Sequence, residues 1–336
     1  MRTDGAVPAM MRAAAIEAFG GPEKLVVREV RVPAVAPHEV LIRVDTAGVG
    51  IWDAKARRGE WADGHEQFPM VLGADGSGTI ASLGDDVRGL SIGDAVYGYA
   101  YGDTKGGFYA EYVALSAEHV APMPASLDFR EAGAIAVTGL TALAGIDDVL
   151  GVRPGQTVLV HGATGGVGTM AVQLAKRRGA RVLATASGGD GRELLRSLGV
   201  DEAIDTHHDD VLAVARRLAP DGVDGLLALA GGPALERAIA ALRDGGRIAY
   251  PNGVEPPDAA ALPAGVTATA FDGVPNPAAF ARLNAILDET PLDVPIAAMY
   301  SLNDAAEAHR RLERGHVLGK IVLVVDATED VVEKVA

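Results

Sequence analysis

The chain has no cysteine among its 336 residues. That absence excludes disulfides, thiolate zinc sites and a cysteine nucleophile, and it fits the reducing cytoplasm in which we expect the protein. Basic residues are also scarce: 30 lysines and arginines stand against 45 aspartates and glutamates, a formal net charge of −15. Nucleic acids and anionic membrane surfaces bind clustered Lys and Arg, so neither is an expected partner.

Long hydrophobic runs are missing too, although apolar residues make up 49% of the chain. The longest stay far below the length of a membrane span. Residues 1–10, MRTDGAVPAM, lack the apolar core of a secretory signal and are predicted to be a flexible tail. A chain of 336 residues exceeds the usual size of one hydrophobic core, so two domains are expected.

The rest of the sequence falls into two regions with different predicted secondary-structure patterns. Residues 11–126 read as short alternating strands broken by Gly and Pro, which predicts a barrel-like β domain. From 127 onward strands and helices alternate, which predicts an α/β region with a parallel sheet wound on both faces. Its six predicted strands lie at 157–161, 181–186, 202–205, 225–230, 247–251 and 266–271.

The clearest functional motif is TVLVHGATGGVGTMAVQLAK at 157–176. A β-prone run enters a glycine-dense turn, and apolar residues then recur at helical spacing. Such a unit places a diphosphate at a helix N-terminus, and no Gly-Lys-Ser/Thr follows to make it a P-loop. The pattern therefore predicts a dinucleotide site at Gly162, Ala163, Thr164, Gly165, Gly166, Val167 and Gly168.

The next strand bears on which dinucleotide binds. An NAD-selective site normally has Asp or Glu at the end of that strand, whereas here it ends Thr-Ala-Ser-Gly-Gly at 185–189. NADP(H) is therefore the predicted cofactor. Ser187 and Arg192 are candidates for its 2′-phosphate, since a guanidinium suits phosphate geometry. The alternative for Arg192 is a solvated residue in the first turn of a helix.

Several further motifs occur in a fixed order, and together they resemble the medium-chain dehydrogenase/reductases. The resemblance runs over nearly the whole chain from Met11 and is strongest to their zinc-free, quinone oxidoreductase-like branch. The motifs are AGVGIWDAK (47–55), FPMVLGADGSG (68–78), GDAVYG (93–98), GGFYAEYV (106–113), TGLTAL (138–143), HGATGGVG (161–168), DGGRIAY (244–250) and AAEAHRRLERGHVLGKIVL (305–323).

The resemblance implies a GroES-like β-barrel domain at 11–126 and 274–336. It also implies a Rossmann NADP-binding domain, a doubly wound six-stranded parallel sheet, at 127–273. Zinc-dependent members carry a ligand cysteine at the position of Gly50, a Gly-His-Glu at 73–75 and a lobe of four cysteines. This chain has Gly-Ala-Asp at 73–75 and no cysteine, so no metal site is expected.

Nicotinamide contacts are also implied by the resemblance. It assigns them to the helix residue Thr141, to the loop residues Tyr250 and Asn252, to Phe271 and to Lys320. The alternatives are a hydrogen bond of Thr141 within its own helix, a place in the core for Phe271 and an exposed strand start for Lys320.

The candidate catalytic residues are Trp52, Asp53 and Lys55. Quinone reductase relatives often have Asn at the position of Gly50 and Tyr at that of Lys55, and both are absent here. Lys55 could stabilise the oxyanion of an enolate or hydroquinone, or it could be an ordinary surface lysine. Asp53 could instead bond local backbone, and Trp52 could belong to an aromatic wall.

The predicted function is NADPH-dependent, metal-free hydride transfer to a quinone or an activated alkene such as an enone. Two alternatives stay open: an enoyl thioester reductase, and a non-catalytic NADP(H)-binding sensor or structural protein. The strand at 266–271 would be a sheet edge, and with the resemblance it predicts a homodimer through that strand.

Overall fold

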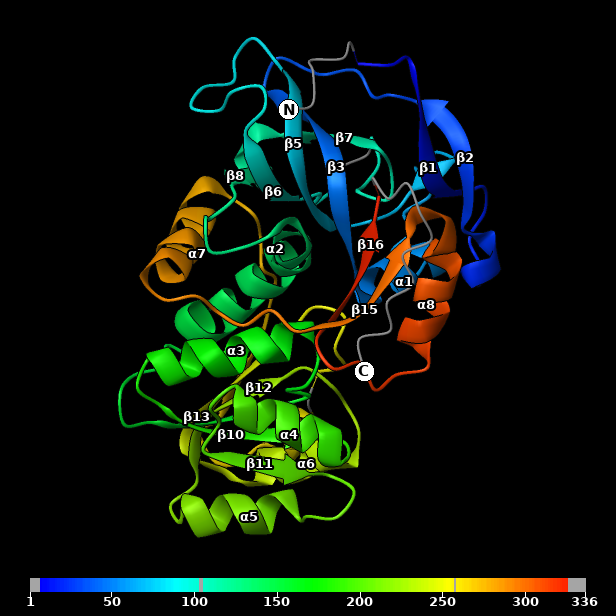
Figure 1. Ribbon diagram of the computed structural model, residues 1–336. Helices are drawn as coiled ribbons and strands as arrows, with labels where there is room; N and C mark the ends of the chain where they lie inside the picture. Colours follow the sequence, from blue (N-terminus) through cyan, green and yellow to red (C-terminus); the bar gives the residue numbers. More distant parts are fainter. Residues whose placement is uncertain (1–6, 103–104, 257, 326–336) are drawn as a thin grey trace.

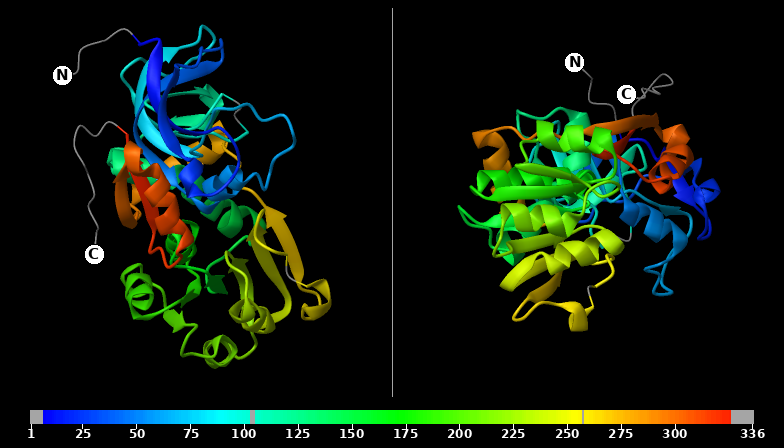
Figure 2. Two further views of the ribbon diagram at one scale, coloured as in Figure 1. Left: turned by 90° about the vertical axis from the view of Figure 1, so that its right-hand side faces the viewer. Right: turned by 90° about the horizontal axis from the view of Figure 1, so that it is seen from below.

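A computed structural model describes residues 7–102, 105–256 and 258–325. Figure 1 shows two halves, one above the other, and Figure 2 views the same arrangement from two further sides. We call the upper part, with two mainly antiparallel sheets, the β half, and the lower part the parallel-sheet half. Of the tail predicted at 1–10, residues 1–6 lie outside the described residues, and the first strand already begins at Met10.

The β half combines sequence from both ends of the chain. A three-stranded sheet has the order β2-β1-β4, and a seven-stranded sheet has the order β15-β16-β3-β5-β6-β8, with β7 pairing to β3. The two last strands thus extend a sheet begun by residues 39–122. The bounds are β1 Met10–Ile16, β2 Val26–Arg31, β3 Glu39–Val49, β4 Met70–Val71, β5 Asp75–Leu83, β6 Ala95–Tyr99, β7 Tyr112–Ser116, β8 Val120–Pro122, β15 Ile296–Ser301 and β16 Lys320–Val324.

The parallel-sheet half contains the six predicted strands. Their order is β11-β10-β9-β12-β13-β14 and every pair is parallel, which is the doubly wound arrangement of dinucleotide-binding sheets. This confirms the predicted six-stranded sheet and its alternating helices. The bounds are β9 Thr157–His161, β10 Arg181–Ala186, β11 Glu202–Asp205, β12 Val223–Ala228, β13 Leu242–Pro251 and β14 Thr267–Phe271, with helices α3 Gly166–Arg177, α4 Gly189–Ser197, α5 Val211–Leu218 and α6 Pro233–Ala240.

One helix lies between the halves. α2 (Phe129–Leu143) packs against β5 and β3 on one side and against α3 on the other (Figure 1). Facing apolar surface on both sides, it is buried all round from Ala132 to Leu143. Among the described residues, 129–149 form the one helix long and apolar enough to cross a membrane, and 78% of its apolar stretch is buried in the fold. That burial fits a core helix.

Three further helices belong to the β half: α1 (Ile51–Arg58), α7 (Pro277–Glu289) and α8 (Ala305–Glu313). Of these, α1 was not predicted. Eight residues are too few to show a helical period. The local signals of α1 were its ends. Asp53 in the first turn accepts a hydrogen bond from the Gly50 amide at 2.7 Å, and Gly59 ends the helix with a φ of 76°. α1 carries all three candidate catalytic residues.

Candidate active site

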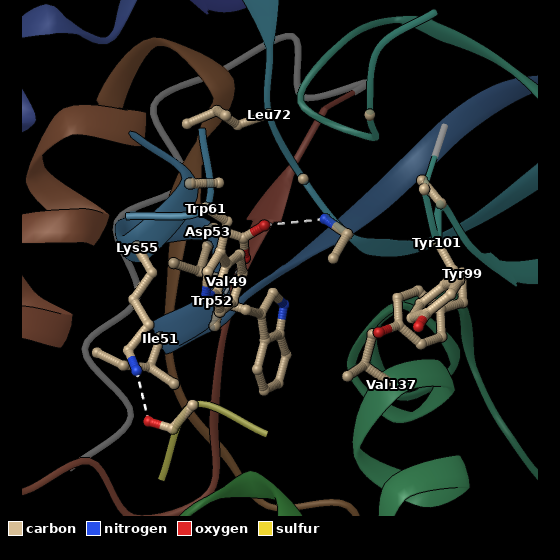
Figure 3. Close-up of a pocket in the computed structure, with 18 of the residues that line it drawn as sticks. Val49, Ile51, Trp52, Asp53, Lys55, Trp61, Leu72, Tyr99, Tyr101 and Val137 are labelled. Atoms are coloured by element: carbon tan, nitrogen blue, oxygen red, sulfur yellow. Dashed lines mark hydrogen bonds between the residues drawn. The ribbon is translucent and has the colours of Figure 1, made fainter. Parts of the chain in front are cut away.

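A cavity of about 1540 Å³ lies between the two halves. Figure 3 shows α1 on one side of it and Tyr99, Tyr101 and Val137 on the other. Eleven of the predicted site residues line it: Trp52, Asp53, Lys55, Thr141, Gly162, Gly165, Gly166, Val167, Gly168, Asn252 and Lys320. The other six do not line it: Ala163, Thr164, Ser187, Arg192, Tyr250 and Phe271.

The glycine turn opens the start of α3 to this cavity. Gly162 has a φ of 78°, which favours glycine, and its amide donates to Thr185 Oγ1 at 3.0 Å. At Gly168 an added Cβ would lie 2.5 Å from the Ala163 Cα, so helix and turn approach too closely for a larger residue. The N-cap Gly165 supplies no side-chain cap, so the first amides of α3 remain available for an anion. The turn therefore fits a dinucleotide diphosphate.

The turn also contacts the β half. The Gly319 amide donates to the Thr164 carbonyl at 2.8 Å, just before β16 begins. A Cβ at Gly319 would lie 2.1 Å from the Pro295 carbonyl oxygen, so only glycine fits there. This contact sets the next residue, Lys320, beside the glycine turn.

Lys320 is buried, not exposed at a strand start. Its Nζ lies 3.1 Å from both carboxylate oxygens of Asp75, and the two side chains are 4% and 0% exposed. Burial raises the pKa of Asp75, while the Lys320 ammonium opposes that change. Two charges removed from water in this way depend on each other, since either one alone would lack a partner.

Asp53 lies close to this pair and is held by backbone. Its two oxygens accept hydrogen bonds from the amides of Gly50 at 2.7 Å and Ala74 at 2.9 Å. Burial raises the pKa of Asp53 to about 7; the nearby Asp75 charge adds to this rise, and Lys320 opposes it. Both acceptor positions are used locally, so the geometry matches the backbone-bonding alternative for Asp53.

Trp52 covers the position next to this cluster. A Cβ built on Gly50 would lie 2.1 Å from the Trp52 Cε2, so the indole occupies the space of a side chain at 50. The Lys320 Nζ lies 4.4 Å from the centre of the Trp52 ring, within range of a cation–π interaction. Among the described residues, the buried indole Nε1 has no hydrogen-bond partner.

A second buried network fixes α1 to α8. Arg57 Nη1 lies 2.8 Å from His309 Nδ1, and His309 Nε2 lies 3.1 Å from the Tyr109 hydroxyl. A guanidinium can only donate, so the imidazole proton must be on Nε2. Burial lowers the pKa of His309 to about 3, and Arg57 and Arg58 add to this effect, so the ring is neutral. The sequence carries no local signal of this network, because its members lie 200 and 252 positions apart.

Lys55 reaches across the cavity to the parallel-sheet half. Its Nζ donates to the Gly253 carbonyl at 2.6 Å, as the dashed line in Figure 3 shows. Gly253 follows Asn252, whose side-chain amide donates to Asp272 at 2.7 Å. In this arrangement the lysine joins α1 to the loop after β13, and its ammonium lies against a carbonyl.

Two other predicted nicotinamide contacts, Phe271 and Thr141, are packed more closely. Phe271 is 8% exposed and belongs to the main hydrophobic core. Thr141 is 7% exposed and touches Gly273, where an added Cβ would lie 2.6 Å from its Oγ1. The bond within the helix that was the alternative for Thr141 is made instead by Thr138, which donates to the Ala134 carbonyl at 2.8 Å.

A separate polar cluster lies at the end of β10. Ser187 Oγ lies 3.3 Å from His316 Nδ1, and His316 Nε2 lies 2.7 Å from an Asp190 oxygen. Arg192 approaches Asp209 at 3.9 Å, and its Nε is buried without a partner among the described residues. His316 belongs to the loop before β16, so this cluster joins both halves. Ser187 and Arg192 were predicted as site residues, whereas the place of His316 beside them was not predicted.

Metal-ligating side chains do not gather in the described part of the chain: no group of three or more His, Asp or Glu is placed to hold an ion. Gly50 and Ala74, at positions where zinc-dependent members of the resembled family have ligands, offer no ligating side-chain atom.

Comparison with known proteins supports the same architecture. Residues 36–125 match the alcohol dehydrogenase GroES-like domain, and residues 166–272 match the zinc-binding dehydrogenase family. Human quinone oxidoreductase is 30% identical over 94% of this chain and 98% of its own. The quinone oxidoreductase structure from Coxiella burnetii is 31% identical, with a TM-score of 0.82 over 94% of this chain and 99% of that one. A structure of an NAD-dependent alcohol dehydrogenase is 34% identical, with a TM-score of 0.83 over 94% and 100%.

A GroES-like β half joined to a Rossmann-type sheet, with a dinucleotide turn at the cleft, defines a medium-chain dehydrogenase/reductase, and the chain belongs to that family. Quinone oxidoreductases are among its relatives, and the protein is an NAD(P)-dependent oxidoreductase. The predicted fold class is confirmed.

Proposed function

We propose that the protein is a metal-free, NADPH-dependent reductase of quinones or activated alkenes. The observation that supports this best is the pairing of two walls in one cavity. The uncapped start of α3 lies on one wall, and the Trp52 indole lies on the other, over a glycine where zinc-dependent relatives have a cysteine. The relatives named quinone oxidoreductase point the same way.

NADPH, when bound, supplies the hydride, and the acceptor takes that hydride together with one proton, leaving NADP⁺ and a reduced product. The chain's own residues bind and orient the reactants. The α3 amides would hold the diphosphate, while Lys55 joins the two walls through Gly253 and Asp53 fixes the α1 start against Ala74. Solvent can provide the proton.

The test of this activity is turnover. The purified protein is mixed with NADPH and either a 1,4-quinone or an α,β-unsaturated ketone, and the loss of NADPH absorbance is followed. We expect turnover of at least one class without added metal and in the presence of a chelator. Activity that a chelator abolishes and zinc restores would contradict the metal-free proposal.

The preference for NADPH over NADH rests on the polar cluster at the end of β10. Ser187, His316 and the Arg192 guanidinium offer donors for a 2′-phosphate, with Asp190 as an opposing charge. Fluorescence titrations should give tighter binding of NADPH than of NADH. H316A should weaken NADPH binding about tenfold, the value of one charge-assisted hydrogen bond, and leave NADH binding unchanged. Equal or tighter binding of NADH by the wild type would reverse this assignment.

The enoyl thioester reductase remains a second candidate because the cavity, at about 1540 Å³, has room for more than one ring. Reduction of a short enoyl thioester faster than any quinone would favour it. The third candidate, a non-catalytic NADP(H)-binding protein, predicts NADPH binding with no oxidation by any acceptor.

We further propose a cytoplasmic homodimer. β14 is an edge strand of the six-stranded sheet, and its open edge could pair with the same strand of a second copy. The two domains would be 127–273 and, together, 11–126 and 274–336. Light scattering should give twice the chain mass, and a proline placed at an outward-facing β14 position should give a monomer.

A further inference from the structure

Trp52 has a location that the site's other functions do not explain. Its indole fills the space above Gly50, where an added Cβ would lie 2.1 to 2.7 Å from three of its ring atoms. Glycine at 50 and tryptophan at 52 are therefore a matched pair, because the ring could not lie there beside any larger residue. The result is a flat apolar surface in the part of the cavity next to Asp53 (Figure 3).

Lys320 holds the indole in place. The Lys320 ammonium lies 4.4 Å from the ring centre, and that ammonium is itself fixed by both oxygens of Asp75. A ring attached to a buried ion pair loses little further freedom when a ligand stacks on it. Trp52 therefore differs from an aromatic residue that merely lines a pocket.

The ring also lies near the predicted cofactor. The Lys320 Cδ is 3.4 Å from the position of a Cβ on Gly166, the first residue of α3, so indole, lysine and glycine turn are consecutive neighbours. Across the cavity, Tyr99, Tyr101 and Val137 form the opposite side (Figure 3). A flat molecule between these sides would meet aromatic surface on both.

From this geometry we infer that Trp52 is the residue that makes the site select flat conjugated rings, that is quinones, over open-chain enones. The inference rests on the proposed function and specifies its substrate class. The reaction is balanced: NADPH, a quinone and one proton give NADP⁺ and the hydroquinone. Trp52 exchanges no electrons or protons and acts by stacking, which favours a ring with two extended faces over a short chain.

The ring face, rather than the indole N–H, performs this role. Nε1 is buried and has no partner among the described residues, so it is not presented to a ligand. A phenylalanine at 52 would keep an aromatic face, smaller than the indole, and would remove the N–H. A leucine would keep apolar volume and remove the aromatic face, and the two variants therefore separate the two possible roles.

The experiment compares wild type, W52F and W52L with 1,4-naphthoquinone and with an acyclic enone. We expect W52L to lower kcat/KM for the quinone about tenfold, mainly through KM, and to change the enone value less than about twofold. W52F should recover most of the lost quinone activity. NADPH affinity, measured by fluorescence, should be the same in all three proteins.

Two outcomes would overturn the inference. An equal loss for both substrates in W52L would mean that Trp52 supports the site in general, and a W52F loss as large as that of W52L would show that an aromatic face at 52 does not select the quinone. If the wild type reduces neither substrate, the proposed function fails separately. In that case, calorimetry of naphthoquinone binding to the NADP⁺ complexes of wild type and W52L still tests the role of Trp52. Equal affinities would refute stacking of the quinone on Trp52.

Discussion

The two walls of the cavity are built from different parts of the polypeptide. The wall at α3 is made of backbone amides within seven consecutive residues, Gly162 to Gly168, and needs mainly the absence of side chains. The wall at α1 is made of side chains, and its central ion pair joins residues 245 positions apart. The first wall is thus a local property of the chain, whereas the second exists only when both ends of the β half have come together.

The ion pair gives the sharpest test of this difference. Lys320→Met leaves the Asp75 charge buried without its partner and should lower the free energy of unfolding by about 3–5 kcal/mol. Lys176→Met is the matched control, because Lys176 pairs with Asp201 at 2.7 Å on the surface, and its loss should cost less than about 1 kcal/mol. Urea unfolding followed by circular dichroism measures both. Similar losses in the two variants would show that burial adds nothing to the inner pair.

A substitution in the wall at α3 should affect both stability and cofactor binding. Gly168→Ala places a Cβ 2.5 Å from the Ala163 backbone and should cost about 1–3 kcal/mol of unfolding free energy, together with a marked loss of NADPH affinity. Gly189→Ala, at the start of α4 with no atom within 4 Å of the added Cβ, should leave the unfolding free energy nearly unchanged. Unfolding and fluorescence titrations report the two effects. Unaltered NADPH binding by the Gly168→Ala variant would separate the turn from the cofactor site.

Per pH unit, the titration of Asp53 gives the smallest of these effects. The pKa of Asp53 is raised to about 7 in the folded protein against an ordinary value of 3.8, so the folded state binds the extra proton between these values. Its contribution to stability is present at low pH and is lost as pH rises toward 7. Relative to Asp53→Asn, the wild type should lose up to ~1.4 kcal/mol per pH unit over this range and then change no further.

Unfolding of both proteins between pH 5.5 and pH 8 checks this prediction. The lowered pKa of His309 has the opposite effect, because its contribution to stability is lost as pH falls below its ordinary pKa. His309 is present in both proteins, so this contribution cancels in their difference. Parallel pH profiles would mean that Asp53 titrates in the folded protein as it does in the unfolded one.

The sequence predicted the parallel sheet well because each strand–helix unit has its own signals. β9, β10 and β11 begin and end at the predicted residues, while β12 begins at Val223, two residues early, and β13 at Leu242, five residues early. The glycine motif likewise indicated its own structure. By contrast, α1 was missed because eight residues lack a period, although Gly59 marked its end.

Single-residue roles on the other wall were harder to predict. Lys320 could be seen as basic, but its burial depends on Asp75 in β5. The hydrogen bond from a threonine hydroxyl back to the preceding turn of α2 is made by Thr138 rather than by Thr141, which instead lies against Gly273. His316 could not be placed beside Ser187 without knowing that the loop before β16 reaches β10.

The local sequence was enough to predict the wall at α3, because spacing, strand context and missing side chains all occur within seven residues. The wall at α1 could be described only from the folded structure. Burying Lys320 with Asp75 and laying Trp52 over Gly50 require elements far apart in the chain to pack together. Contacts of that kind carry no local pattern, because the energy that fixes them comes from removing charged and apolar groups from water only after the chain has folded.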